Sequence, residues 1–313
     1  MRAFGAILAA FLLSVFISAT CLHAADVGTV PPLVLRVAAQ EQDPPLDKAA
    51  FRAVIESSPT SVSKPLGPND DMVVLLILDL TGDISRIDTA RGVLAERLQA
   101  LPANTWVAVV KSQDVLEVLV DPTPDRQKVL TAIQEYGVTG KAGLLDTLEP
   151  AVKMGDLLLS HSNVRVAVVY LTDSNVYNSR EDFTNPVINA SDAGDLSRRF
   201  PDQLIKEKMG KLSDALAGFQ APLFFVHLNY YSDPINEALQ RGLLQLAEES
   251  GGTGAFCRSV GDIPDALEKV LTSVQHSWSI GVELPAAAAK SATVHLFNGD
   301  REVPSHSRFS LRR

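Results

Sequence analysis

Apolar runs alternate with amphipathic stretches between Met72 and His276, and this alternation constrains the fold more than any other feature. The runs are VVLLILD (73–79), WVAVVK (106–111), VRVAVVYLTD (164–173), LFFVHL (223–228) and, more weakly, GAFCRS (254–259). Strands that are apolar throughout, with helices between them, are typical of a parallel sheet covered on both faces. We therefore expect an α/β fold with a doubly wound, mostly parallel sheet and helices on both faces.

One further strand should run against the others. The segment VLEVLV (115–120) follows the second run after only the short turn SQD, which is too short for a parallel crossover. Helices are expected over 87–101, 125–136, 144–160, 202–219, 236–250 and 263–276. In the first of these, Ile87, Leu94 and Leu98 fall on one helical stripe. Trp106 and Phe224–Phe225 are expected in the core.

The segments on either side of this region have a different composition. Residues 26–70 are rich in Pro, Asp and Ser, and they predict a short strand at 33–38, a short helix at 47–56 and an exposed linker, SSPTSVSKPLGPNDD. After the last helix, SWSIGVELP and ATVHLFNGDREV read as two strands, with NGD as a turn signal. The tail is therefore expected to form a small β appendage that also pairs with 33–38.

The first 24 residues are typical of a secretory signal peptide. Arg2 precedes an apolar stretch from Phe4 to Ala19, and small residues follow near Ala24. An uncleaved membrane anchor is the alternative, but the apolar stretch is short and has no basic flank after it. We expect a protein exported to the periplasm or the cell exterior. Its parts would be a signal peptide (1–24), an N-terminal extension and linker (25–70), the α/β domain (71–276) and a β-hairpin extension (277–313).

Charge and cysteine content exclude several classes of function. The formal net charge is −9, and removal of Arg2 with the signal peptide makes it −10. An acidic chain without a run of basic residues does not suit nucleic-acid binding, because contacts to phosphates need clustered Lys and Arg. Only Cys257 remains after cleavage, so no internal disulfide forms, and no Cys/His cluster indicates zinc.

Polar side chains gather where two parallel strands end. Asp79 closes the first run, Thr81 and Asp83 follow at alternate positions, and Asp173 closes the run 164–173. In doubly wound sheets, ligands bind outside the carboxyl ends of the strands. Carboxylates that lie close together repel each other, unless one is protonated or a hard cation lies between them. The pattern therefore predicts a crevice with oxygen ligands for Mg²⁺ or Mn²⁺.

These motifs resemble those of the von Willebrand factor type A domain, and more narrowly those of secreted bacterial VWFA-related proteins best known from Acidobacteria. The resemblance covers residues 72–276, and the segments that carry it are VVLLILDLTGD, ALPANTWVAVV, LVDPTPDRQKVLTAI, GKAGLLDTLEPAV, VVYLTD and LAEESGGTGAF. It implies a protein-binding module with a metal-ion-dependent adhesion site. In the family, that site uses Asp-x-Ser-x-Ser, a Thr from a later loop and an Asp after a strand.

The match to that site is partial. Asp79, Thr81 and Asp173 fit the family pattern, whereas Asp83 replaces the second Ser and Ala142 replaces the Thr. The resemblance implies Asp79, Thr81, Asp83 and Asp173 as metal ligands. In the alternative, Asp79 and Asp173 accept hydrogen bonds from helix N-termini without a metal, and Asp83 caps the helix that begins near Ser85.

Three classes of function stay open at this point. The first is an exported module that binds an unidentified protein partner at the loops around Asp79 and Asp173. The second is an envelope scaffolding protein with a decayed, metal-free site. The third is a hydrolase or phosphatase that uses Asp79 as nucleophile, but such phosphatases need a second Asp two residues later, where this chain has Thr81.

Overall fold

The computed structural model describes residues 33–179, 201–285 and 290–311, and Leu33–Arg313 belong to one compact unit. The predicted signal peptide lies outside the described residues. The strands are β1 (Val34–Gln40), β2 (Phe51–Ile55), β3 (Ser58–Thr60), β4 (Val62–Leu66), β5 (Met72–Asp79), β6 (Thr105–Ser112), β7 (Leu116–Thr123), β8 (Arg165–Thr172), β9 (Leu223–His227), β10 (Gly254–Phe256), β11 (Ser277–Glu283), β12 (Ser291–Asn298), β13 (Arg301–Glu302) and β14 (Arg308–Ser310). The helices are α2 (Ile84–Gln99), α3 (Arg126–Glu135), α4 (Leu144–His161), α5 (Pro201–Leu216), α6 (Pro234–Glu249) and α7 (Ile263–Gln275), with 3₁₀ turns η1 (Val176–Asn178) and η3 (Val260–Asp262).

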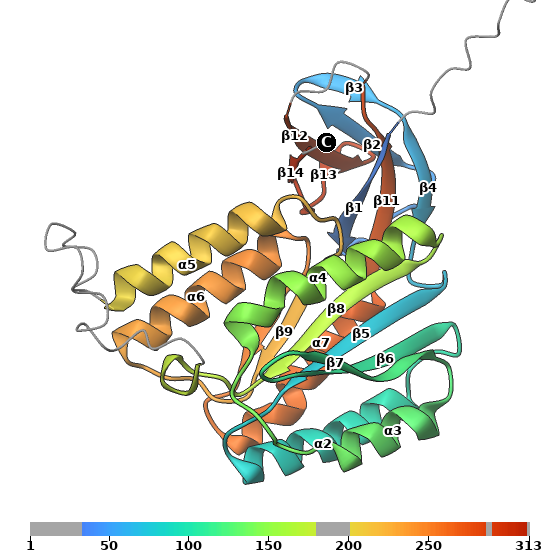
Figure 1. The fold of residues 1–313 in the computed structure, drawn as a ribbon. Helices are drawn as coiled ribbons and strands as arrows, with labels where there is room; N and C mark the ends of the chain where they lie inside the picture. The colour runs from blue at the N-terminus through green and yellow to red at the C-terminus, as the bar shows by residue number, and fades with distance from the viewer. Residues whose placement is uncertain (1–32, 180–200, 286–289, 312–313) are drawn as a thin grey trace, which may run out of the picture. The chain divides into compact units, whose positions relative to one another are not determined.

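The central sheet confirms the predicted fold class. Its six strands lie in the order β10-β9-β8-β5-β6-β7 (Figure 1). All neighbours pair in parallel except β6 and β7, which are antiparallel as the short SQD turn predicts. The chain moves outward from β5 on one side through β6 and β7, and on the other through β8, β9 and β10. The order reverses between β5 and β8, which is where such sheets bind ligands.

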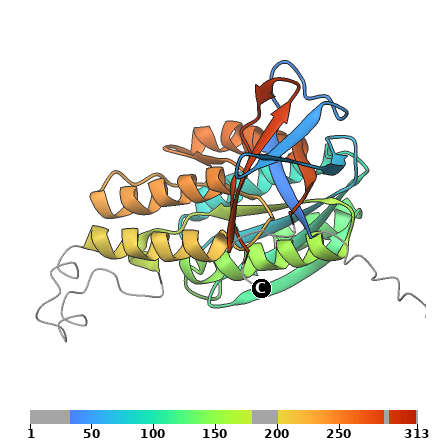
Figure 2. The same cartoon turned by 90° about the horizontal axis from the view of Figure 1, so that it is seen from above.

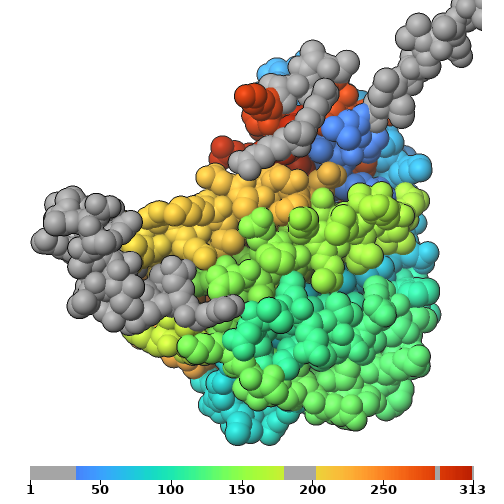
Figure 3. Space-filling view, in the orientation of Figure 1, coloured from blue at the N-terminus to red at the C-terminus, as the bar shows by residue number. Residues whose placement is uncertain are grey.

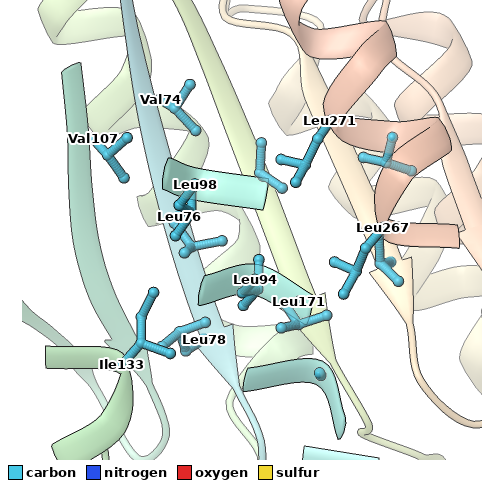
Figure 4. Close-up of a cluster of buried hydrophobic side chains, with 14 of the residues drawn as sticks. Val74, Leu76, Leu78, Leu94, Leu98, Val107, Ile133, Leu171, Leu267 and Leu271 are labelled. Atoms are coloured by element: carbon cyan, nitrogen blue, oxygen red, sulfur yellow. The ribbon is translucent and has the colours of Figure 1, made fainter. Parts of the chain in front are cut away.

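Helices cover both faces of this sheet and close a core on each side. On one face, α2, α3 and α7 bring Leu94, Leu98, Ile133 and Leu267 against the side chains of β5 and its neighbours (Figure 4). On the other face, α4, α5 and α6 bury a second cluster against the alternate strand residues. The helices α5 and α6 lie side by side in both cartoon views (Figures 1 and 2).

The remaining strands form two smaller sheets, in the orders β1-β11-β4 and β13-β12-β2-β3, and β14 also pairs with β12 in the second of them. The predicted pairing of 33–38 with the tail is confirmed, since β1 and β11 are antiparallel with Val37 opposite Ile280. The NGD turn joins β12 to β13, where Asn298 is opposite Arg301. These sheets share a third apolar cluster, which includes Trp278.

Some local predictions are wrong. The expected helix at 47–56 is the strand β2, which pairs with β12 and buries Phe51, Ala53 and Ile55 on alternate positions. The expected linker contains β3 and β4, which join the two small sheets. β11 and β12 belong to different sheets and do not form a hairpin with each other. Trp106 is 44% exposed on β6, whereas Phe224 and Phe225 are buried as predicted.

A buried arginine holds together the two chain segments that lead into and out of the central sheet. Arg165, at the start of β8, is 2% exposed. Its guanidinium donates to the carbonyls of Pro68 and Asp70 before β5, and to those of Gln275 and Ser277 at the junction of α7 with β11. Burial lowers its pKa to about 10, so it stays charged at neutral pH.

None of the helices described is long and apolar enough to span a membrane.

Replacement of Arg165 by Met should lower the free energy of unfolding by about 3 kcal/mol or more, because four buried or partly buried carbonyls lose a charged donor. Arg241→Met is the matched control, since Arg241 is exposed and contacts Glu237 of the same helix, through a 3.5 Å ion pair and a hydrogen bond from Nε to the Glu237 carbonyl at 3.3 Å. Its effect should stay within about 0.5 kcal/mol. Urea unfolding measures both. Equal effects of the two substitutions would contradict this role of Arg165.

Candidate functional site

The carboxyl ends of β5 and β8 bring the first and last predicted site residues together. The two strands are neighbours, and Asp79 is in register with Thr172, which directly precedes Asp173. The Asp173 N–H donates to the Asp79 carbonyl at 3.2 Å. Asp79 and Asp173 are 0% and 3% exposed. The sequence therefore located the edge of the sheet at which these two acids meet.

The Asp79 carboxylate accepts three hydrogen bonds from the protein itself. Its Oδ1 accepts the backbone N–H of Gly143 at 2.9 Å, and its Oδ2 accepts the hydroxyls of Thr172, at 2.8 Å, and of Ser174. Burial raises the pKa of Asp79 to about 6, and these three hydrogen bonds limit the increase. The side chain thus connects β5, the loop after β8 and the start of α4.

Asp173 is bound in a similar way by the loop that follows β5. Its two carboxylate oxygens accept the backbone N–H groups of Thr81 and Gly82, at 2.8 and 2.7 Å. A Cβ at Gly82 would lie 2.8 Å from Asp173 Oδ2, so the close approach of the backbone needs glycine here. Burial raises the pKa of Asp173, against the effect of the two N–H donors.

The other two predicted ligands have different contacts. Asp83 is the N-cap of α2 and accepts the Ser85 N–H at 2.8 Å, as the capping alternative predicts. Its other oxygen lies 3.7 Å from Arg86 Nε. The Thr81 hydroxyl accepts the side-chain amide of Asn178 at 3.3 Å. Asp83 therefore faces a helix N-terminus and an arginine.

The residues of this edge do not fit a divalent cation as they are arranged. Both oxygens of Asp79 and both oxygens of Asp173 already accept protein donors. Ala142, at the position of the family's Thr, is buried and has no side-chain oxygen. Within the described part of the chain, no group of three or more His, Cys, Asp or Glu side chains could hold a metal ion. The metal ligation of Asp79, Thr81, Asp83 and Asp173 stays a prediction from the sequence.

Sequence reasoning missed the groups that satisfy the two acids. Thr172 and Ser174 lie on either side of Asp173 in the sequence. Residues at alternate positions of an extended segment point to the same side, so this spacing was the available signal for two hydroxyls that face Asp79. The Ser174 carbonyl lies 2.7 Å from Nε2 of His227, a fully buried residue at the end of β9. Burial lowers the pKa of His227 to about 4, so its ring is neutral at pH 7. No short-range pattern in the sequence links His227 to this edge.

A second buried network lies one layer deeper. The hydroxyls of Ser112, Thr147 and Tyr170 contact one another, with 2.6 Å between Ser112 and Thr147 and 2.7 Å between Ser112 and Tyr170. The Tyr136 hydroxyl accepts the Leu80 N–H at 3.2 Å. Strands β6 and β8 and helix α4 are therefore linked by hydroxyl groups below the loops, and Tyr136 holds the residue that follows β5.

The loops around this edge expose large apolar side chains. Ile84 and Tyr177, 72% and 59% exposed, follow β5 and β8. Val115 lies in the turn after β6, and Val138 lies in the loop that leads to Gly143; they are 68% and 50% exposed. We call the segments that carry these four residues, namely the start of α2, η1 and the two loops, the rim. Its base is polar and hydrogen-bonded within the protein, and its outer side exposes these four apolar side chains beside polar ones such as Thr139 and Lys141.

Comparisons with known proteins give structural likenesses only. No family model and no curated protein matches the sequence. Among solved structures, the vWF domain of the type V pili tip protein Mfa5 from Porphyromonas gingivalis has a TM-score of 0.44 and 12% identity, over 67% of this chain and 96% of that one. The PilB minor pilin from Streptococcus sanguinis has a TM-score of 0.47 and 12% identity, over 66% and 62%. Proximal thread matrix protein 1 from the mussel byssus, with a zinc-occupied MIDAS motif, has a TM-score of 0.44 and 13% identity, over 70% and 49%. The fold is assigned from the strand order of the central sheet.

The raised pKa of Asp79 predicts a pH-dependent stability. In the folded state the Asp79 carboxyl group keeps its proton up to about pH 6, whereas the ordinary pKa of this group is 3.8. The resulting stability is fully present below pH 3.8 and is lost as pH rises through 6. Relative to Asp79→Asn, the wild-type protein should therefore lose roughly 3 kcal/mol of unfolding free energy across this window. Chemical denaturation of both proteins from pH 4 to 7 measures the difference, and a pH-independent difference would contradict the assignment.

Proposed function

We propose that this protein is an exported protein-binding module, used in adhesion or assembly, whose binding surface is the rim. The observation that supports this is the exposure of Ile84 at the start of α2, Tyr177 in η1, and Val115 and Val138 in loops, all at one edge of the sheet. Interfaces are enriched in aromatic and large apolar groups at their centre. The acidic composition and the absence of a basic run favour a protein partner over nucleic acid. Export rests on the sequence of residues 1–24.

We further propose that the rim binds its partner without a divalent cation. In a cation-dependent site, a bound Mg²⁺ or Mn²⁺ would need oxygen ligands that this edge uses for internal hydrogen bonds. Asp79 accepts three donors, Asp173 accepts two, and Asp83 caps α2. The alternative, a cation-dependent adhesion site, requires Asp79 or Asp173 to give up these donors.

The same contacts favour a non-enzymatic role. A nucleophilic carboxylate has to reach its substrate, but Asp79 is 0% exposed and both of its oxygens face protein donors. The position two residues later, which would supply the acid–base group of a phosphatase, is Thr81. We therefore propose binding and not hydrolysis as the activity of this edge.

The rim proposal predicts that Ile84→Glu combined with Tyr177→Ala reduces capture of a partner from the envelope fraction of the source cells by about tenfold or more. Leu157→Glu is the matched control, because Leu157 is 53% exposed on α4, outside the rim. The control should capture as much partner as the wild-type protein. Quantitative mass spectrometry of the eluates measures this. A partner lost equally with both variants, or retained by the rim variant, would place the interface elsewhere.

Cation independence predicts that calorimetric titration with Mg²⁺ or Mn²⁺ at millimolar concentration gives no saturable heat. Capture of the partner should also be unchanged by a chelator. Asp79→Ala serves as the control for the location of any binding. Saturable binding that Asp79→Ala abolishes would contradict the proposal and support the cation-dependent alternative.

A further inference from the structure

A cavity of about 460 Å³ lies away from the rim, at the C-terminal ends of α5 and α6. The helices contribute Ser213, Asp214, Leu246 and Glu249 to its walls, and the strands β12 and β14 with the residues before β14 close the other side. The Ser310 N–H donates to the Ala217 carbonyl at 2.6 Å, which joins β14 to the end of α5. In Figure 3 the yellow surface of α5 borders the red surface of the C-terminal strands. Cavities of this size are typical of small-ligand sites.

The cavity combines an apolar lining with charges of both signs on different walls. Leu216, Leu246, Ala292 and Phe309 are buried apolar residues among those that line it. The negative groups, Asp214 and Glu249, come from the two helices. The helix C-termini add partial negative charge on the same side.

The positive group, Arg308, comes from the part of the lining that the strands contribute. Arg308 is an exposed residue on β14. Among the described residues, the side chains of Arg308 and Asp214 have no hydrogen-bond or ion-pair partner, whereas Glu249 accepts Ser213 Oγ at 2.9 Å and Gln245 Nε2 at 2.7 Å. Glu249 is therefore held in place, and the two other charges are available to a ligand.

His306 fixes the backbone that carries Arg308. It is 4% exposed, its ring packs on Phe309 with centroids 3.9 Å apart, and its Nε2 lies 3.0 Å from the Arg308 carbonyl. The Nε2–H donates to that carbonyl, because a carbonyl only accepts. His306 acts here as a positioning residue in the wall.

We propose that this cavity binds a small zwitterion, namely a free α-amino acid with an apolar side chain. Its carboxylate pairs with the Arg308 guanidinium, and its ammonium group pairs with Asp214 and Glu249 beside the helix C-termini. Its side chain contacts Leu216 and Leu246. A simple amine would leave Arg308 without a partner, and a simple carboxylate would lie beside two acids, so the full zwitterion matches both walls.

The test is calorimetric titration of the purified full-length protein with leucine, methionine and phenylalanine. Two analogues of leucine serve as probes: 3-methylbutylamine lacks the carboxylate, and 4-methylpentanoate lacks the ammonium group. We expect saturable binding of at least one amino acid at millimolar concentration or below. Each of the two analogues should bind at least about tenfold more weakly than leucine itself.

Substitutions locate the site. Asp214→Asn and Arg308→Gln should each weaken amino-acid binding by about tenfold. Glu96→Gln, an exposed acid on α2, is the matched control and should leave the affinity unchanged. Both test positions are exposed, so thermal melts of the variants should match the wild-type protein. Absence of saturable binding by all three amino acids, equal affinity for the amine, or binding that Arg308→Gln does not weaken would overturn the proposal.

Discussion

The arrangement of the loops at the carboxyl edge of the sheet depends on the buried carboxylate of Asp79. A charge in a fully buried position is costly unless donors surround it, and here the donors come from three separate segments. Gly143 at the start of α4, and Thr172 and Ser174 around the end of β8, all donate to it. The side chain therefore fixes where α4 begins relative to the sheet and where the loop after β8 leaves it. Asp173 fixes the loop after β5 through Thr81 and Gly82.

In this arrangement, the buried base of the carboxyl edge and the exposed surface around it have different roles. Each carboxylate oxygen of the two acids accepts at least one protein donor, and both side chains are almost without exposure, so these groups hold the loops in place. The outward-facing side chains of those segments include the exposed apolar groups of Ile84, Val115, Val138 and Tyr177. At the opposite end of the sheet, Arg165 holds the entering and leaving chain by four carbonyls. The sheet is thus fixed at both ends, and a rigid frame lowers the entropic cost of binding at its loops.

Much of the fold could be predicted from the sequence, because a parallel sheet produces long apolar runs that local patterns detect. The strands β5, β6, β8 and β9 and all six helices lie within a few residues of their predicted places. The strand β2 was missed because FRAVI is short and its β structure depends on pairing with β12, more than 230 residues later in the chain. The exposure of Trp106 was missed because an apolar run does not show which strand face a helix leaves uncovered.

For the candidate site, too, one part could be predicted from the sequence and another part could not. Strand ends are visible in the sequence, so Asp79 and Asp173 could be placed at one edge. The side-chain contacts could not be derived, because whether an acid binds a cation or accepts N–H groups depends on loop geometry. Gly143, which donates to Asp79, lies next to the Ala142 that removes the expected hydroxyl, and only the structure shows that a backbone donor approaches the acid from this loop.

The most direct test of the account is a crystal structure of this protein grown in millimolar Mn²⁺, with anomalous diffraction data that locate manganese. The account predicts no anomalous peak at the carboxyl edge of the sheet, with Asp79 accepting the Gly143 N–H and the hydroxyls of Thr172 and Ser174. An anomalous peak within coordination distance of Asp79, Thr81 or Asp173 would contradict it.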